Sequence, residues 1–236
     1  MSIKAVLFDL DGTLLPMDQD EFVKAYFKGL AAKLSNRGYD QKQLIDAVWA
    51  GTVAMIKNTS QKTNEKVFWE LFSGIFGQDV LEDEPYFDEF YRTDFQKVQS
   101  VCSFEPLAAD LVHKLKNKGY IVALATNPLF PAIATESRIR WAGLSPEDFK
   151  IYTTYENINR SKPHPEYYLQ VAKQLGLAPE ECLMVGNDVE DDMVAEKVGM
   201  KVFLVTDNLI NKKNADISSY PHGSFSQLVE FFDKMN

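Results

Sequence analysis

The chain has 236 residues, with 34 Asp and Glu against 25 Lys and Arg, which gives a formal net charge of −9. Hydrophobic residues make up 45% of the chain and charged residues 25%, which is typical of a globular protein and excludes a disordered one. The length suffices for one large or two modest domains that need no disulfides. The acidic balance disfavours nucleic acid and anionic membrane surfaces as partners. No apolar run approaches the roughly 20 residues of a membrane span, so we expect no membrane partner.

The two cysteines and the first residues of the chain indicate the cellular compartment. Cys102 and Cys182 lie far apart in the sequence, which favours free thiols in a reducing compartment. The chain leads from Met1 directly into a strand-like segment and lacks the pattern of a secretion signal. We therefore expect a cytoplasmic protein. The oligomeric state is unknown at this stage.

Short runs rich in Val, Ile, Leu and Phe predict strands that are buried on both faces of a parallel sheet. These runs cover residues 5–8, 121–125, 182–185 and 202–205. Helical patterns lie between the later ones: leucines repeat every four residues between Pro106 and Gly119, and another apolar stripe ends at Gly176. Proline at the start and glycine at the end are typical of helices. This alternation predicts an α/β fold with a doubly wound, Rossmann-like parallel sheet.

A long segment without strand patterns interrupts this alternation after the first strand. Residues 18–98 indicate successive amphipathic helices, with Asp18, Asp40 and Thr63 as predicted N-caps and Pro85 at the start of a fourth helix that carries Val98. We expect an inserted helical domain over residues 17–99, which we call the cap. The α/β core domain with the catalytic site is then expected over residues 1–16 and 100–236.

The cap contains a group of phenylalanines that could bind substrate but that we expect to form the cap's own core instead: Phe68, Phe72, Phe76, Phe87 and Phe90. A predicted loop between helices supplies the other candidates: Lys57, Asn58 and Lys62.

Two carboxylates, Asp9 and Asp11, directly follow the first predicted strand and precede Gly12. Ligands of open α/β sheets bind beyond the carboxyl ends of strands. Residues two apart in an extended chain point to the same side, so the two carboxylates would repel each other. A divalent cation, most naturally Mg²⁺, would relieve this repulsion, as would a proton on one carboxyl. A simple turn or helix cap is the alternative for such a pattern taken alone.

Three further polar clusters follow predicted strands, and the strand predicted before the middle one covers residues 151–154. Thr126 and Asn127 come after the second, where a hydroxyl and backbone N–H groups could hold an oxyanion. Lys162 lies in a proline-rich turn, beside His164, which we interpret as a helix-entry residue. Taken singly, Thr126 could cap a helix and Lys162 could be solvated. The last cluster is acidic, follows Gly186 and could also be a helix N-terminus: Asn187, Asp188, Asp191 and Asp192. Together, the clusters meet at one edge of one sheet.

In this order the four clusters resemble the motifs of the haloacid dehalogenase-like hydrolase superfamily, and the insertion resembles its all-helical cap. Asp9 to Thr13 match the first motif, Thr126 the second, Lys162 the third, and residues 186–192 the fourth. One departure concerns the fourth motif, because Asn187 stands where the family has Asp. Asp188 is favoured over Asn187 as the metal ligand, since an anionic oxygen binds Mg²⁺ better than an amide. Asp192 is then a ligand or a ligand's partner, with Asp191 as its rival.

The resemblance implies a Mg²⁺-dependent phosphatase that hydrolyses a small phosphorylated metabolite through an aspartyl-phosphate on Asp9. Asp11 would be the general acid and base. The resemblance further assigns phosphate binding to three residues and metal binding to four positions: Thr126, Asn127 and Lys162 for phosphate; Asp9, the backbone carbonyl of Asp11, Asp188 or Asn187, and Asp192 for metal.

Other activities share parts of this pattern, and a binding protein without activity is disfavoured because no motif position is missing outright. A phosphomutase of the same superfamily keeps all four motifs. A dehalogenase is disfavoured by Asp11, which such enzymes generally lack. A phospho-accepting regulatory protein without turnover shares the acidic pair, Thr and Lys, but it is a single domain of about 120 residues without a helical insertion.

Overall fold

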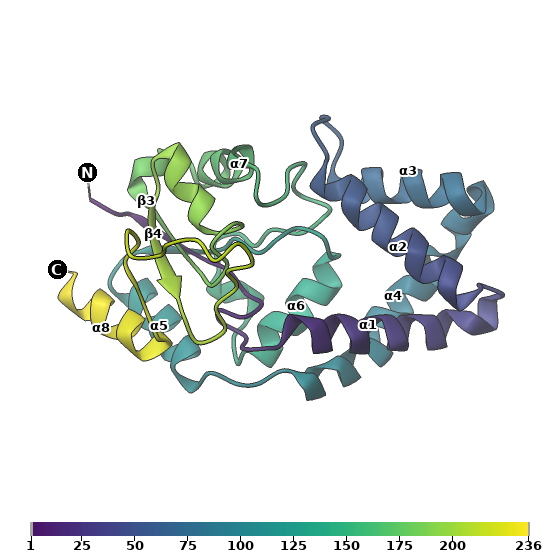
Figure 1. Cartoon of the computed structure of the whole chain (residues 1–236), viewed down its shortest axis with the longest axis horizontal. Helices are drawn as coiled ribbons and strands as arrows, with labels where there is room; N and C mark the ends of the chain where they lie inside the picture. Colours follow the sequence, from purple (N-terminus) through teal and green to yellow (C-terminus); the bar gives the residue numbers. More distant parts are fainter. Residues whose placement is uncertain (1, 236) are drawn as a thin grey trace.

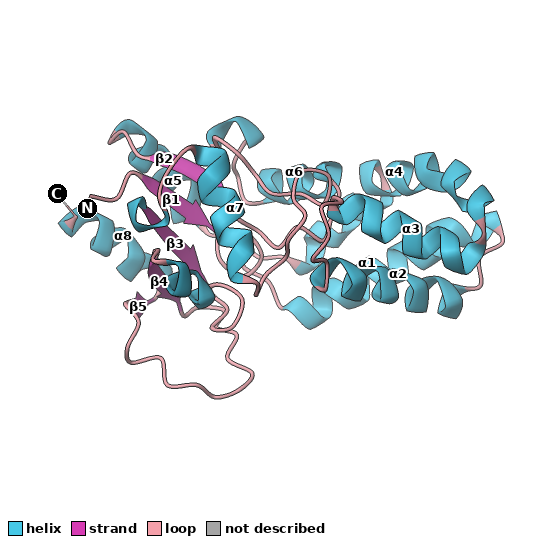
Figure 2. Ribbon diagram, turned by 90° about the horizontal axis from the view of Figure 1, so that it is seen from above, coloured by secondary structure: helices cyan, strands magenta, loops and turns pink. Residues whose placement is uncertain are grey.

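The computed structural model describes residues 2–235, and these contain a five-stranded parallel sheet in the order β2-β1-β3-β4-β5. In Figure 2 the strands lie side by side in this order, with β2 at the top and β5 at the bottom. Their bounds are β1 Ala5–Phe8, β2 Ile121–Leu124, β3 Cys182–Gly186, β4 Lys201–Val205 and β5 His222–Gly223. The strands predicted at residues 5–8, 121–125, 182–185 and 202–205 are confirmed. The strand predicted at residues 151–154 is wrong, because this segment makes only an isolated bridge between Tyr152 and Leu124. The sequence analysis missed β5, because two residues carry no pattern that distinguishes a strand from a turn.

Helices cover both faces of the sheet, and alternate strand residues divide between them. Val6 and Phe8 of β1 belong to the apolar cluster on the side of α5 (Pro106–Asn117), α6 (Ala132–Trp141) and α8 (Phe225–Lys234), whereas Ala5 and Leu7 belong to the cluster with α7 (Pro165–Leu175). All four residues of β1 are fully buried. Burial of each large side chain contributes about 1.5–3 kcal/mol, which explains why the central strands read as continuous apolar runs.

Between β1 and α5 the chain forms the helices of the cap, which lie to one side of the sheet (Figure 1). They are α1 Gln19–Leu34, α2 Gln41–Ile56, α3 Asn64–Phe76 and α4 Glu84–Arg92. The predicted N-caps are confirmed: Asp18 accepts a hydrogen bond from the N–H of Glu21 at 3.0 Å, and Asp40 accepts one from Gln43 at 2.9 Å. Thr63 caps α3 in the same way.

The prediction that the fourth cap helix continues to Val98 is wrong. The α-helix α4 ends at Arg92, and residues 94–101 form a 3₁₀ helix instead. The hydroxyl of Thr93 donates to the backbone oxygen of Glu89 at 2.7 Å, and such local side-chain bonds compete with a regular helix. Val98 is buried in either case, so the apolar pattern could not reveal the break.

Hydrogen bonds join the cap to the core at several places. The entering and leaving segments run side by side, where the N–H of Ser103 donates to the oxygen of Pro16 at 2.8 Å. At the other side, Asn64 at the start of α3 is fully buried and donates to the oxygen of Pro128 at 3.1 Å and to the hydroxyl of Ser161 at 2.9 Å. These contacts hold the cap over the edge of the sheet where the strands end.

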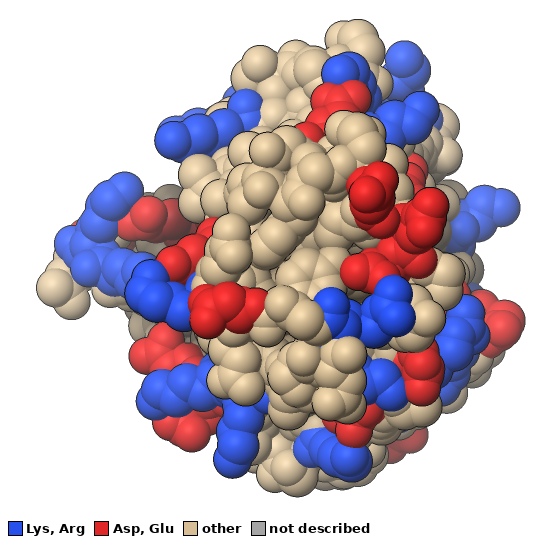
Figure 3. Space-filling view, turned by 90° about the vertical axis from the view of Figure 1, so that its right-hand side faces the viewer, with Lys and Arg blue, Asp and Glu red and all other residues tan. Residues whose placement is uncertain are grey.

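The outer surface of the cap end carries Lys, Arg, Asp and Glu side chains that are intermingled, with no large area of one sign (Figure 3). Within residues 2–235, no helix has the length and apolar character needed to cross a membrane.

Candidate active site

Asp9 lies immediately after β1 and is 7% exposed. The turn that follows it requires Gly12, whose φ is +88°, and a Cβ at this position would also collide with the amide of Asn187. The next residue, Thr13, donates to the side-chain oxygen of Asn187 at 3.1 Å. The first and fourth motifs are therefore packed against each other.

Lys162 lies between two carboxylates at the base of the site. Its Nζ donates to Asp9 at 2.7 Å and to Asp192 at 2.6 Å, and its side chain is only 1% exposed. Burial alone would lower the pKa of Lys162, but the charges of Asp192 and Asp9 hold the pKa well above its usual value. Lys162 is thus a fixed, buried cation, and the alternative of a solvated loop lysine is excluded.

Both oxygens of Asp192 have protein partners. One accepts from Lys162, and the other accepts from the backbone N–H of Asp188 at 2.9 Å. Asn187 is also occupied, because its oxygen accepts from Thr13 and its nitrogen donates to the backbone oxygen of Asn208 at 2.6 Å. The side chains of Asn187 and Asp192 thus link segments of the site to one another, and the metal binding predicted for them stays a prediction.

Asp188 lines the same cavity as Asp9 and keeps one oxygen without a hydrogen bond to residues 2–235. Its other oxygen accepts from the backbone N–H groups of Glu190 and Asp191 at 2.8 and 3.0 Å. Burial and the charge of Asp188 raise the pKa of Asp191 to about 6. Asp191 accepts from the side-chain amide of Asn127 at 3.2 Å.

Thr126 and Asn127 follow β2 directly. Thr126 lines the cavity and is not the cap of the next helix, since α6 begins at Ala132 after Pro131 as its N-cap. The side-chain amide of Asn127 bridges two motifs, because its oxygen also accepts from the backbone N–H of Lys162 at 3.3 Å. The backbone N–H of Asn127 has no acceptor among the described residues.

Arg138 is a residue of the site that the sequence analysis missed. It lies on α6, is fully buried and donates from Nη1 to a carboxylate oxygen of Asp11. Its guanidinium also lies 4.4 Å from the ring centre of Phe130. The available signal was a charged residue in line with two buried alanines four residues away on either side, Ala134 on α6 and Ala142 at its C-cap.

Asp11 points into the cavity, and about a fifth of its side chain is exposed. Its other carboxylate oxygen is buried without a hydrogen-bond partner among residues 2–235. Burial raises the pKa of Asp11, whereas the charge of Arg138 opposes that rise. The net direction is upward, which favours a carboxyl group that can hold a proton.

The predicted loop candidates do not reach this site. Lys57, Asn58 and Lys62 are absent from the cavity wall, and Lys62 instead pairs with Glu70 at 2.8 Å. His164 is the N-cap residue of α7, as expected of a helix-entry residue, and its Nε2 lies 2.9 Å from the backbone oxygen of Ile56 in the cap.

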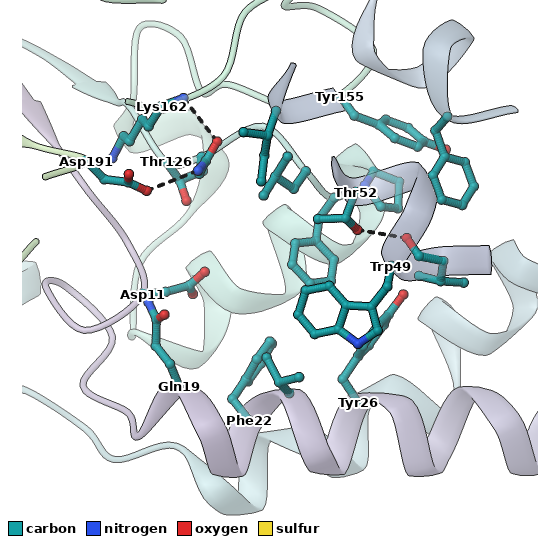
Figure 4. A pocket seen from close by; sticks show the side chains of 18 of the residues that line it. Asp11, Gln19, Phe22, Tyr26, Trp49, Thr52, Thr126, Tyr155, Lys162 and Asp191 are labelled. Carbon is teal, nitrogen blue, oxygen red and sulfur yellow. Dashed lines mark hydrogen bonds between the residues drawn. The ribbon is translucent and has the colours of Figure 1, made fainter. Parts of the chain in front are cut away.

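A cavity of about 400 Å³ extends from the carboxylates into the cap, a volume typical of small-molecule sites. In Figure 4, Asp11, Thr126, Lys162 and Asp191 lie at one end, and the indole of Trp49 projects from α2 toward α1 at the other. The prediction that the cap phenylalanines form only its core is partly wrong: Phe68 and Phe87 also line the cavity, whereas Phe72 and Phe90 are fully buried.

The acidic end of the cavity has the donor chemistry of a magnesium site. Mg²⁺ is usually held by one or two carboxylates, with water and substrate oxygens completing its coordination. The carboxylates of Asp9 and Asp188 supply hard oxygen donors there. Residues 2–235 contain no group of three His, Cys, Asp or Glu side chains placed to hold a metal. The two carboxylates at this end fit a cation that takes its remaining coordination from water and substrate.

Residues 3–199 match the sequence model of the haloacid dehalogenase-like hydrolases. The chain belongs to this family. It is 26% identical over 206 residues to the pyrophosphatase PpaX of Bacillus cereus, across 87% of this chain and 84% of that protein. It is 29% identical over 212 residues to the N-acetylmuramic acid 6-phosphate phosphatase of Pseudomonas aeruginosa, across 87% of this chain and 82% of that one. The chain is accordingly an enzyme of the phosphoric monoester hydrolase type.

Solved structures share the fold of this family member. A HAD phosphatase from Thermococcus onnurineus superimposes with a TM-score of 0.57 at 20% identity, with 98% of each chain covered. YfnB of Bacillus subtilis, solved with magnesium bound, superimposes with a TM-score of 0.58 at 18% identity, with 99% of this chain and 100% of that one covered. The Rossmann-like sheet and the helical cap are thus the family's architecture.

Proposed function

We propose that this protein is a Mg²⁺-dependent phosphatase of small phosphate monoesters that works through an aspartyl-phosphate on Asp9. The observation that carries the proposal is the placement of Asp9 at the end of β1, 2.7 Å from the buried cation of Lys162. One oxygen of Asp9 attacks phosphorus as the ester bond breaks and the alcohol leaves. Water then attacks the aspartyl-phosphate, which releases inorganic phosphate and restores Asp9.

Three residues hold the phosphoryl oxygens in this proposal. The hydroxyl of Thr126, the backbone N–H of Asn127 and the ammonium of Lys162 stabilise the charge that develops during transfer. Asn187 and Asp192 act as positioning residues, because Asn187 ties the turn after Asp9 to the fourth motif and Asp192 holds Lys162. Fixed donors of this kind need no reorganisation when the transition state forms.

Asp9, Asp188 and the backbone carbonyl of Asp11 would hold Mg²⁺. When bound, the ion neutralises the repulsion between the carboxylate and the phosphate oxygens and orients the phosphoryl group. Support comes from the hard oxygen donors at this end of the cavity and from the magnesium in the structure of the family member YfnB.

Asp11 gives its proton to the leaving oxygen in the first step and takes a proton from the attacking water in the second. The raised pKa of its carboxyl supports this task. We further propose that residues 1–16 and 100–236 are the catalytic core domain and residues 17–99 the cap domain that supplies substrate contacts. The free thiols of Cys102 and Cys182 fit a cytoplasmic enzyme.

Phosphate release tests the proposed function. With Mg²⁺ we expect multiple turnovers on p-nitrophenyl phosphate and on a panel of alkyl, sugar and acyl phosphates. Removal of the ion by a chelator should reduce the rate at least about 100-fold, because the carboxylates then repel the substrate, and added Mg²⁺ should restore it. Folded protein that binds Mg²⁺ but releases at most one phosphate per chain would contradict a phosphatase.

The pairing of Arg138 with Asp11 predicts a pH effect. Because a cation beside a carboxyl lowers its pKa, Arg138→Gln should raise the pKa of Asp11 further. The rate depends on protonated Asp11 and falls as pH rises through that pKa, so the alkaline limb of the pH profile should move to higher pH in Arg138→Gln. Measurement of kcat/KM against pH for wild type and variant tests this, with propyl phosphate as the substrate because its leaving oxygen needs a proton. The exposed residue Arg140 provides the control, since Arg140→Gln should leave the limb in place.

A further inference from the structure

The wall of the cavity differs strongly in character between its two ends. The core end carries Asp9, Asp188 and Lys162. The cap end is formed mainly by aromatic and aliphatic side chains from all four cap helices, among them Phe22, Trp49 and Tyr91. Ten of the residues that line the cavity are Phe, Tyr or Trp. Such a surface is suited to an apolar group that leaves water.

The charged residues that the cap contributes to the cavity wall restrict the kind of leaving group further. The cap contains ten Lys and Arg residues in its sequence, yet none of its described Lys or Arg residues lines the cavity. Blue side chains lie on the outer face of the cap end in Figure 3. The charged residues that the cap does contribute are Glu84 and Asp88, both on α4. A second anionic group on the substrate would therefore meet repulsion at this end and find no cationic partner from the cap.

Trp49 is an aromatic side chain of α2 that is not buried in the core of the cap. It is 45% exposed although it is a large apolar residue, and it projects into the cavity (Figure 4). Its ring centre lies 5.3 Å from that of Phe27, which also lines the cavity. An aromatic ring between α1 and α2 would cover both side chains.

We propose that the substrate is a phosphate monoester whose leaving group is uncharged and apolar, large enough to include an aromatic ring. This inference rests on the proposed function, because the phosphate must lie at Asp9, Thr126 and Lys162 for the leaving group to enter the cap end. The cavity binds the ring among the cap aromatics, and Glu84 and Asp88 disfavour esters that carry a carboxylate or a second phosphate.

Three phosphate esters test this proposal. Each has a primary alcohol as its leaving group, so the reactivity of the ester bond is similar and differences in rate report on how the cavity binds the rest of the molecule. They are 2-phenylethyl phosphate, propyl phosphate and 2-carboxyethyl phosphate. Burial of a phenyl ring should make kcat/KM for 2-phenylethyl phosphate at least about 10-fold higher than for propyl phosphate. The value for 2-carboxyethyl phosphate should be at least about 10-fold lower than for propyl phosphate, because like charges repel.

Two variants assign the preference to named residues. Trp49→Ala should reduce kcat/KM for 2-phenylethyl phosphate about 10-fold more than for propyl phosphate. Asp88→Lys, at an exposed position of α4, should raise kcat/KM for 2-carboxyethyl phosphate about 10-fold. Asp79→Lys is the matched control, since it makes the same change of charge at an exposed cap residue outside this cavity. It should leave the ratios of kcat/KM between the three esters unchanged.

The outcomes distinguish this inference from the function on which it rests. Phosphate release from 2-carboxyethyl phosphate as fast as from 2-phenylethyl phosphate would overturn the substrate class and leave the phosphatase intact. If Trp49→Ala reduced kcat/KM equally for all three esters, the cap aromatics that line the cavity, the aromatic wall, would have no role in substrate choice. No phosphate release from any of them, nor from p-nitrophenyl phosphate, would overturn the phosphatase itself and the substrate class with it.

Discussion

Replacement of Asp9 by Asn should abolish turnover, with kcat reduced by about 10⁴-fold or more, because the amide cannot attack phosphorus. The amide is similar in size to the carboxylate, so the packing around the end of β1 is retained. The measurement is steady-state phosphate release at saturating Mg²⁺ and substrate.

The control for Asp9→Asn is the same change at Asp110, which is exposed on α5 and remote from the cavity. Asp110→Asn should keep the wild-type rate. Because Asp9 neighbours Lys162, the folded fraction of Asp9→Asn should be checked by circular dichroism. A folded Asp9→Asn protein with more than about a hundredth of wild-type kcat would be incompatible with Asp9 as the nucleophile.

Replacement of Lys162 by Met should have the second largest effect and should change both activity and stability. The substitution leaves the buried carboxylates of Asp9 and Asp192 without their shared cation. Removal of one partner from a buried ion pair costs about 3–5 kcal/mol in the free energy of unfolding. Loss of a donor to the transferring phosphoryl group should reduce kcat by a further factor of about 10²–10³.

Denaturant unfolding and phosphate release measure the two effects separately. Lys173→Met removes an exposed lysine from α7 and should leave both quantities near wild type. The double variant Lys162→Met with Asp192→Asn should recover part of the stability and none of the activity, since it removes one of the two unpaired carboxylates but restores no cation. Recovery of activity in the double variant would show that Lys162 serves only to neutralise Asp192.

The core fold and the gathering of the four motifs could be predicted because their signals are local. The apolar runs around Val6 and Val185 are fully buried strands, and Asp18 and Asp40 cap helices as side-chain chemistry requires. Parallel strands end at one edge of a sheet, so Asp9, as well as Thr126 and the fourth motif, had to meet there.

The features that the sequence analysis missed depend on contacts between distant segments. Arg138 is separated from Asp11 by 127 residues, and nothing near it in the sequence names an acidic partner. The two tasks of Asn187 depend on Thr13 and on the backbone of Asn208. The aromatic wall could not be distinguished from a helical core by periodicity, because Phe68 and Phe72 share one face of α3 and only Phe68 reaches the cavity.

The most direct test of the central claim is to locate the phosphoryl group during the reaction. Asp11→Asn cannot activate the attacking water, whereas p-nitrophenyl phosphate does not need a proton for its leaving group. With Mg²⁺, this variant should therefore give a burst of one nitrophenolate per chain, and peptide mass spectrometry after acid quenching should find the phosphoryl group on Asp9. Absence of both burst and phosphopeptide, or a phosphoryl group on another residue, would contradict the aspartyl-phosphate mechanism.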